Sequence, residues 1–189
     1  MKTSTSTTRE LKRRLATIQS YYDLDDLLSR KTDQRAIAKY YRLSDFFYNL
    51  IHSCGGHNIH MSLSDDGKFS RKGFHRQAEI ISQHITSGTT KVLELGAGRA
   101  ANTKYLARKF PNVNFTALDL PNRNFLRSRV PKNVSLVEGD YNDLSRFQPG
   151  TFDLVFAVET ICHAQSKQNV FAQVSRVLKR GWGGYVCRF

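Results

Sequence analysis

Residues 91–100 are Lys-Val-Leu-Glu-Leu-Gly-Ala-Gly-Arg-Ala, and residues 115–119 are Phe-Thr-Ala-Leu-Asp. The first segment has the pattern of a buried strand that leads into a glycine-rich turn, and the second that of another strand ending in an acid. The residues between them are expected to form a helix that Pro111 ends. Together these elements predict the first half of a nucleotide-type cofactor site.

The residue types in this stretch suit a ligand with a ribose. Gly96 and Gly98 carry no side chains, so the backbone can bend sharply and a ligand can approach it closely. A carboxylate at Asp119 can accept hydrogen bonds from two ribose hydroxyls. Glu94 would repel a pyrophosphate and favour a cationic or ammonium-bearing ligand. The third glycine of the dinucleotide motif is also absent, which argues against a nicotinamide oxidoreductase.

These residues resemble a known family. Val92–Gly98 together with Asp119 resembles motif I and its partner acid in class I S-adenosylmethionine (SAM) methyltransferases. Three later segments follow in the order typical of that family: Val134–Tyr141 resembles its third strand with a Gly-Asp pair, Phe152–Val158 its fourth strand, and Val177–Gly181 the turn before its fifth. The resemblance implies SAM as the cofactor and contacts to it from Glu94, Gly96, Ala97, Gly98, Asp119, Leu120, Asp140 and Tyr141. In that family the acid after the third strand binds the adenine amino group.

Residues 157–164, Ala-Val-Glu-Thr-Ile-Cys-His-Ala, resemble the stretch after strand four in sterol and tocopherol methyltransferases. On a helical turn, Glu159 and His163 would lie on the same side and face the sulfonium. Glu159 would then stabilise the positive charge that moves toward the acceptor, and His163 would accept a proton. The alternative is a helix-capping Glu and a His at the edge of the core. Zinc is not expected, because no third ligand is evident.

The N-terminal part carries a second resemblance. Lys39–Arg42, Phe47–Tyr48 and Gly55–His60 resemble the Tyr-Tyr…Phe-Tyr…Trp-Gly…His segment of the same group and of glycine-betaine-forming methyltransferases. This implies a cover over the cofactor, with Tyr41 in contact with it. The Trp of that pattern is missing here, and plain core aromatics at positions 40 and 41 are the alternative.

Strands that alternate with helices predict an α/β fold with a doubly wound, mostly parallel, Rossmann-like sheet. Residues 1–85 are expected to form an N-terminal helical cover, and residues 86–189 the SAM-binding domain. The family has two further strands after the fifth, so this domain is expected to be incomplete and its fifth strand to be an edge prone to self-association. We expect helices at 8–29, 33–51, 71–85 and 168–178, and strands at 91–95, 114–118, 134–138, 152–158 and 184–189.

Charge and cysteine content limit the partners and the compartment. The formal net charge is +13, and its densest cluster lies on the first expected helix, at Arg9, Lys12, Arg13 and Arg14. A solvated basic face is the simplest interpretation, with an anionic membrane surface or a nucleic acid as alternatives. The 3 cysteines lack metal-ligand spacing and favour a reducing cytoplasm.

The function predicted from these observations is SAM-dependent methylation of a small molecule, with a lipid-like, isoprenoid or amine acceptor. One alternative is a truncated methyltransferase-like module that binds cofactor or a partner without turnover. Another is methylation of RNA. The Asn/Asp-Pro-Pro-Tyr stretch that grips an extruded base amine is absent after strand four, where Val158-Glu-Thr-Ile stands, so this alternative is the weaker one.

Overall fold

The computed structural model describes residues 5–23, 25–26, 39–40, 43–44, 62–64, 67–121, 126 and 129–187. The chain divides into two compact units, Met1–Asp33 and Gln34–Phe189. The first unit contains helix α1 (Thr5–Gln19), which ends before the predicted Ser29. The predicted helix at 33–51 falls almost wholly outside the described residues, and so does the predicted cofactor contact Tyr41.

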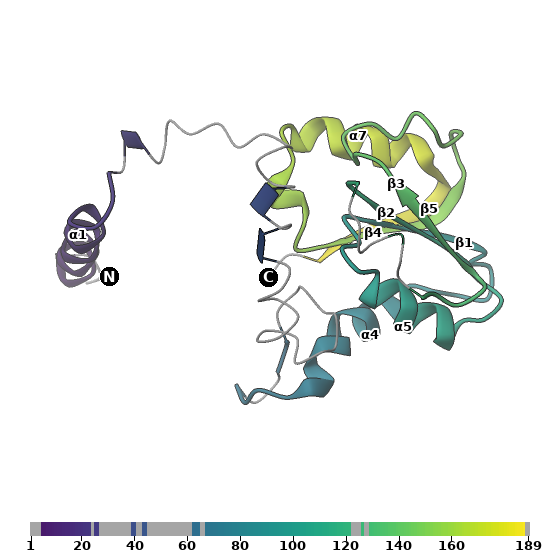
Figure 1. Cartoon of the computed structure of the whole chain (residues 1–189), viewed down its shortest axis with the longest axis horizontal. Helices are drawn as coiled ribbons and strands as arrows, with labels where there is room; N and C mark the ends of the chain where they lie inside the picture. The colour runs from purple at the N-terminus through teal and green to yellow at the C-terminus, as the bar shows by residue number, and fades with distance from the viewer. Residues whose placement is uncertain are drawn as a thin grey trace. The chain divides into compact units, whose positions relative to one another are not determined.

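The second unit is built on a sheet of parallel strands (Figure 1). The strands are β1 (Lys91–Leu95), β2 (Asn114–Asp119), β3 (Val134–Glu138), β4 (Phe152–Val158) and β5 (Leu178–Cys187). Their order is β3-β2-β1-β4-β5, so the chain moves outward in one direction from β1 and in the other from β4. This confirms the predicted doubly wound fold, and it places the switch point at the carboxyl ends of β1 and β4, where such sheets bind ligands.

Short helices precede β1 and connect β1 to β2 and β4 to β5. They are the 3-10 helix η2 (Arg71–His75), α4 (Arg76–Ser82), α5 (Ala101–Lys109), the 3-10 helix η3 (Ile161–His163) and α7 (Lys167–Val177). The helix predicted at 71–85 is therefore a 3-10 turn followed by a short α-helix. Ser166 caps α7, because its hydroxyl accepts a hydrogen bond from the Asn169 amide.

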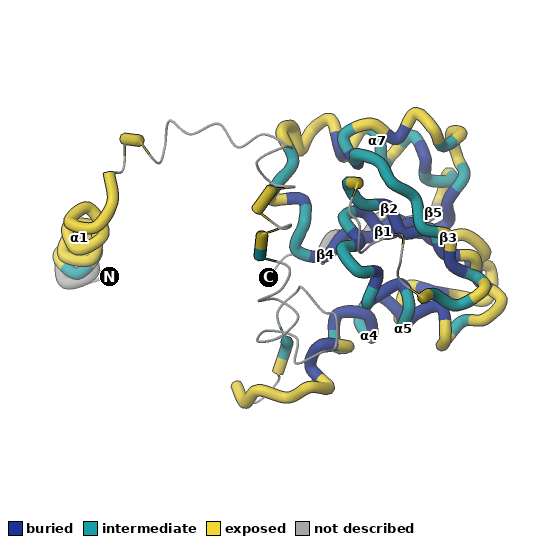
Figure 2. Tube along the Cα trace, in the orientation of Figure 1, coloured by how far each residue is buried: buried dark blue, intermediate teal, exposed yellow. Residues whose placement is uncertain are grey.

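Each face of the sheet carries its own apolar core. On one face, Ala78 and Ile81 of α4 pack with Phe156 of β4. On the other, Val170 of α7 packs with Val155. Every residue of β4 is buried, as expected for a strand covered on both faces, and Figure 2 shows β4 in dark blue. This double packing fixes the ends of the strands, from which the site is built.

One buried carboxylate joins the amino ends of three strands. Asp153 Oδ2 accepts hydrogen bonds from the Thr90 amide, the Thr90 hydroxyl and the Lys91 amide, each at 2.8 Å, and Oδ1 pairs with Lys179 Nζ at 2.6 Å. Burial disfavours the charged form, but Lys179 and the donors from Thr90 and Lys91 outweigh it and lower the pKa of Asp153 to about 2. This contact aligns β1, β4 and β5 at the edge opposite the ligand site.

Within the described part of the chain, every helix is too short or too polar to cross a lipid bilayer.

Candidate cofactor and active site

The predicted site residues that the structure describes lie at or near the ends of β1, β2, β3 and β4, at the carboxyl edge of the sheet. After β1 the chain turns through left-handed backbone at Gly96 (φ 62°) and Gly98 (φ 58°), a conformation that L side chains rarely adopt. A Cβ at Gly96 would also collide with the Thr160 side chain, so the loops after β1 and β4 are in close contact. The predicted need for glycine is confirmed at both positions.

Asp119 ends β2 directly beside the glycine turn. Its carboxylate accepts a hydrogen bond from the Gly98 amide at 2.5 Å, and the Ala97 amide donates to the Leu118 carbonyl at 3.0 Å. Burial raises the pKa of Asp119 to about 6, although the amides of Gly98 and Leu120 act in the opposite direction. Asp119 is therefore a partly buried acceptor that faces the turn.

Glu94 is directed at helix α5. It is only 2% exposed, and its carboxylate accepts hydrogen bonds from the Thr103 amide (3.2 Å), the Thr103 hydroxyl and the Asn102 side-chain amide. Burial raises the pKa of Glu94 to about 7, against these hydrogen bonds. Because Ala100, before the helix, has no capping side chain, Glu94 serves as the acceptor for the first turn of α5. Its predicted contact with a cationic ligand stays a prediction.

The loop after β3 is hydrogen-bonded to the end of β2 and to the loop after β4. The Gly139 amide donates to the Asp119 carbonyl at 2.8 Å, and the Tyr141 hydroxyl donates to the Thr160 carbonyl at 3.0 Å. Burial raises the pKa of Tyr141 to about 12. Asp140 Oδ1 accepts from the backbone and side-chain amides of Asn142 at 2.8 and 2.7 Å, which holds this carboxyl group at the strand end.

The backbone between Glu159 and His163 differs from the prediction. Glu159 has a φ of 50°, η3 covers only Ile161–His163, and the His163 amide donates to the Thr160 carbonyl at 3.0 Å. The two residues therefore do not share one regular helical turn, so that geometric premise is wrong. Their roles in catalysis stay predictions.

Sequence reasoning missed Gln77. This residue of α4 is 0% exposed, and its Nε2 donates to Glu159 Oε1 at 2.9 Å. The only signal in the sequence is a long polar side chain directly before Ala78, on a helix whose buried side packs on the sheet. This pattern does not indicate that the hydrogen-bond partner of Gln77 is Glu159, which lies 82 positions away in the sequence.

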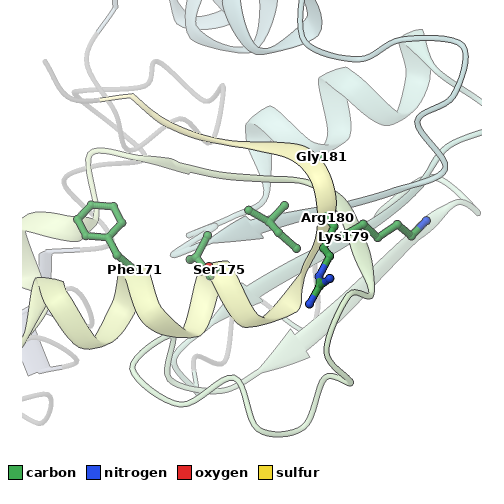
Figure 3. Close-up of a pocket in the computed structure, with 7 residues that line it drawn as sticks. Phe171, Ser175, Lys179, Arg180 and Gly181 are labelled. Carbon is green, nitrogen blue, oxygen red and sulfur yellow. The ribbon is translucent and has the colours of Figure 1, made fainter.

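A hollow of about 330 Å³ lies between α7 and the start of β5 (Figure 3). Because β5 begins at Leu178, the hollow is at the amino edge of the sheet, away from Asp119. It is therefore separate from the candidate cofactor site. Its lining consists of Phe171, Val174, Ser175, Leu178, Lys179, Arg180 and Gly181.

Comparison with known proteins identifies the family of this chain. A family model described as a methyltransferase domain matches residues 93–187. The chain is 29% identical over 171 residues to sarcosine/dimethylglycine N-methyltransferase of Halorhodospira halochloris, a match that covers 82% of this chain and 59% of the relative. It is 27% identical over 170 residues to sterol 24-C-methyltransferase of Eremothecium gossypii, covering 83% of this chain and 45% of the relative. The chain thus spans about half the length of these relatives.

Solved structures agree on the fold. A protein from Galdieria sulphuraria, provisionally named a sarcosine dimethylglycine methyltransferase, superposes with a TM-score of 0.61 at 25% identity, covering 72% of this chain and 56% of that one. The [4+2]-cyclase SpnF superposes with a TM-score of 0.71 at 19% identity, covering 80% and 58%. At that identity, the second likeness concerns the fold alone.

Proposed function

Because this chain belongs to the methyltransferase domain family, we propose that it transfers a methyl group from SAM to a small-molecule acceptor. The observation that carries the proposal is the placement of the Asp119 carboxylate against the Gly98 amide, at the switch point of a doubly wound sheet. The two relatives compared above are named for methylation of sarcosine or dimethylglycine and of a sterol. Both are small molecules, which supports a lipid-like, isoprenoid or amine acceptor.

The residues present fit this cofactor. When bound, SAM supplies an activated methyl group on its sulfonium. Gly96 and Gly98 offer bare backbone at the turn, and Asp119 offers a hydrogen-bond acceptor to ribose hydroxyls. Asp140, at the end of the neighbouring strand, offers a second carboxyl group for the adenine amino group. We further propose that the backbone amides of Ala97, Leu120 and Tyr141 line the same site.

In the proposed mechanism, the residues after β4 act on the acceptor. Glu159 would place a carboxylate near the charge that develops there, and His163 would take up a proton when the acceptor carries one.

We also propose that residues 1–85 cover the site, with Tyr41 in contact with the cofactor, and that residues 86–189 bind the cofactor. A cytoplasmic location is proposed from the low cysteine content.

The test combines binding with turnover. Isothermal titration of the chain with SAM should give a saturable isotherm, and the change Asp119→Ala should weaken binding at least about tenfold by removing the hydroxyl acceptor. Asp143→Ala, which removes an exposed carboxylate from the loop after β3, is the matched control and should bind as the wild type does. Methyl transfer from labelled SAM to sarcosine or a sterol then separates an enzyme from a binding module. Equal binding by Asp119→Ala and wild type would reject the proposed site.

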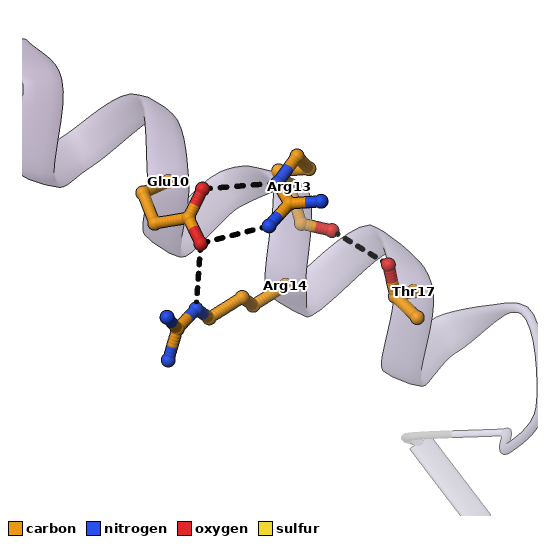
Figure 4. A network of polar contacts seen from close by, with 4 residues as sticks. All are labelled: Glu10, Arg13, Arg14 and Thr17. Atoms are coloured by element: carbon orange, nitrogen blue, oxygen red, sulfur yellow. Dashed lines mark hydrogen bonds and ion pairs between the residues drawn. The ribbon is translucent and has the colours of Figure 1, made fainter.

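We propose that α1 contacts anionic membranes. Leu11, Leu15 and Ile18 are exposed and recur at helical spacing. Figure 4 shows Glu10 held by Arg13 and Arg14, hydrogen bonds that lower the pKa of Glu10. An apolar stripe with basic residues on the same helix suits the headgroup region of a bilayer.

The membrane proposal is tested by sedimentation with vesicles. Binding is expected to phosphatidylserine-containing vesicles and not to pure phosphatidylcholine. Leu15→Glu should abolish it, whereas Thr17→Glu adds the same charge on the polar side and should weaken it less. Equal loss in the two variants would indicate charge attraction alone, and a shift with RNA at physiological salt would favour nucleic acid.

We also propose self-association through β5, which lies at the edge of the described sheet. Sedimentation velocity over a concentration series should show a dimer, and a monomer at every concentration would reject this contact.

A further inference from the structure

Gln77 links the helix before β1 to the loop after β4. Its side chain is 0% exposed, and its Nε2 donates to Glu159 Oε1 at 2.9 Å. The opposite orientation of the amide would set an oxygen against the carboxylate, so this contact requires Nε2 as the donor. Glu159 has a further interaction as well, and Gln77 contributes to its placement together with it. A residue far from the glycine turn thus contacts a carboxylate with a proposed role in methyl transfer.

The helix that carries Gln77 is well supported. Ala78 and Ile81 of α4 are 0% exposed and pack in the core against the sheet. Lys109 of α5 donates to the Ser82 hydroxyl at 3.0 Å, which ties the end of α4 to α5. Side chains that orient another group work best from rigid elements, and α4 meets this condition.

The loop that carries Glu159 is fixed at its backbone. Glu159 has a φ of 50°, a conformation that persists in a non-glycine residue where surrounding contacts enforce it. A Cβ at Gly96 would collide with the side chain of Thr160, and the Thr160 carbonyl accepts from the Tyr141 hydroxyl at 3.0 Å. Such contacts place the Cα of Glu159 but leave its side-chain torsions a choice of rotamers. The hydrogen bond from Gln77 restricts that choice.

A glutamine at position 77 works against stability in one respect. Its Oε1 is buried and finds no hydrogen-bond partner among the residues that the structure describes. Buried polar atoms are nearly always paired, and an unpaired one disfavours the folded state. Methionine, an apolar side chain of similar length, would fill this space without an unpaired oxygen. Packing alone therefore does not account for the glutamine, whereas orientation of Glu159 does.

We propose that Gln77 is a positioning residue, which orients the Glu159 carboxylate toward the methyl acceptor through the hydrogen bond from its Nε2. This inference rests on the proposed function and extends the active site to α4. Gln77 acts through Glu159 and itself touches neither cofactor nor acceptor. Its loss should therefore slow methyl transfer and leave the binding of both substrates unchanged.

A double-mutant cycle tests this dependence. Gln77→Met removes the donor with little change in volume, Glu159→Gln removes the carboxylate, and the double variant combines the two changes. Gln83→Met makes the same exchange at an exposed position just after α4 and is the matched control. Methyl transfer from labelled SAM to sarcosine and to lanosterol gives kcat and KM, and isothermal titration gives SAM affinity.

The expected result is a loss of kcat that depends on Glu159. Gln77→Met should lower kcat at least about tenfold, while KM and SAM affinity change less than about twofold. In the Glu159→Gln background the same change should have no further effect on kcat, because no carboxylate is left to orient. Gln83→Met should behave as the wild type does. If Gln77→Met does not fold by circular dichroism, Gln77→Glu replaces it in the same cycle, since it keeps the size and sets a second acceptor against Glu159.

Other results overturn the proposal. Unchanged kcat in the Gln77 variant would do so, as would a loss that appears in KM or SAM affinity alone. Equal fold losses of kcat with and without the Glu159 carboxylate would also overturn it, because they indicate a residue that only supports the fold. A wild-type chain that binds no SAM, or that methylates neither acceptor, rejects the proposed function itself. Independent losses in an active chain reject only the role of Gln77.

Discussion

At the scale of single residues, we expect the ionisation of Asp119 to affect cofactor binding. Only the ionised carboxyl group is an acceptor at both oxygens, and the pKa of Asp119 is raised to about 6 by burial. The acceptor form therefore grows as pH rises from 5 to 7.

We predict that SAM affinity increases with pH through this range. With a pKa of about 6, the ionised fraction at pH 7 is about tenfold that at pH 5, and SAM affinity should rise up to about tenfold. Asp119→Asn should bind more weakly and show a flat profile. Titration calorimetry across the range measures both, and a flat wild-type profile would contradict the role of Asp119.

The ionisation of Glu94 bears on the stability of the fold. Burial raises its pKa from 4.5 to about 7 in the folded chain. A carboxyl group with a raised folded pKa contributes stability that is fully present below its unfolded pKa and is lost as pH rises through the folded value. Charging Glu94 thus works against the fold near neutral pH.

For Glu94→Gln, we predict a weaker dependence of stability on pH. Wild-type unfolding free energy should fall by about 3 kcal/mol as pH rises from 4.5 to beyond 7, because of this group. The glutamine keeps an acceptor for the Thr103 amide and does not titrate. Urea unfolding at a series of pH values measures the difference. Identical slopes in variant and wild type would show that Glu94 is not the titrating group.

At the scale of elements, Asp153 is the contact that holds the amino ends of β1, β4 and β5 in register. The pKa of Asp153 is lowered from 3.8 to about 2 in the folded chain. The charged carboxylate therefore stabilises the fold above pH 3.8, and this stabilisation is lost as the pH falls through 2. Asp153→Asn should cost about 2 kcal/mol at pH 7. The exposed Asp143→Asn should cost less than about 0.5 kcal/mol. Urea unfolding measures the loss of stability in both variants, and equal losses would refute the role of Asp153 in holding the three strands together.

Asn133, directly before β3, binds the end of α5 and the turn before β2. Its Nδ2 donates to the carbonyls of Ala107 (3.1 Å), Phe110 (3.1 Å) and Val113 (2.8 Å), which closes the end of α5 and the turn into β2. We predict that Asn133→Ala lowers the unfolding free energy by about 1–3 kcal/mol, since it removes the side-chain amide that donates to all three carbonyls. Asn112→Ala, at an exposed position in the same turn, is the control for thermal or urea unfolding.

At the scale of the whole molecule, local patterns predicted most of the sheet. The bounds of β1, β3 and β4 match the prediction, because each is a short apolar run between turn residues. The last strand was predicted to start at 184 but starts at Leu178, which pairs with Phe152. Residues 178–181 are Leu-Lys-Arg-Gly, without a strand pattern, and their conformation depends on that distant partner.

The sequence predicted those parts of the site in which the residue type reflects the backbone conformation or the position at a strand end. The glycines and Asp119 follow from their position at strand ends, since the turn requires left-handed backbone. The left-handed Glu159 carries no such signal, and the expected helical turn to His163 was wrong for that reason. Gln77 was missed because its contact with Glu159 exists only once α4 packs on the sheet.

Main-chain hydrogen bonds join the segments at the carboxyl edge: the Ala97 amide donates to the Leu118 carbonyl, and the Gly139 amide donates to the Asp119 carbonyl. Such links are indifferent to most substitutions in the loops, because exchanging a side chain leaves the amides and carbonyls where they were. Side chains in these loops can therefore be exchanged one after another while the main-chain links that position the strand ends are kept.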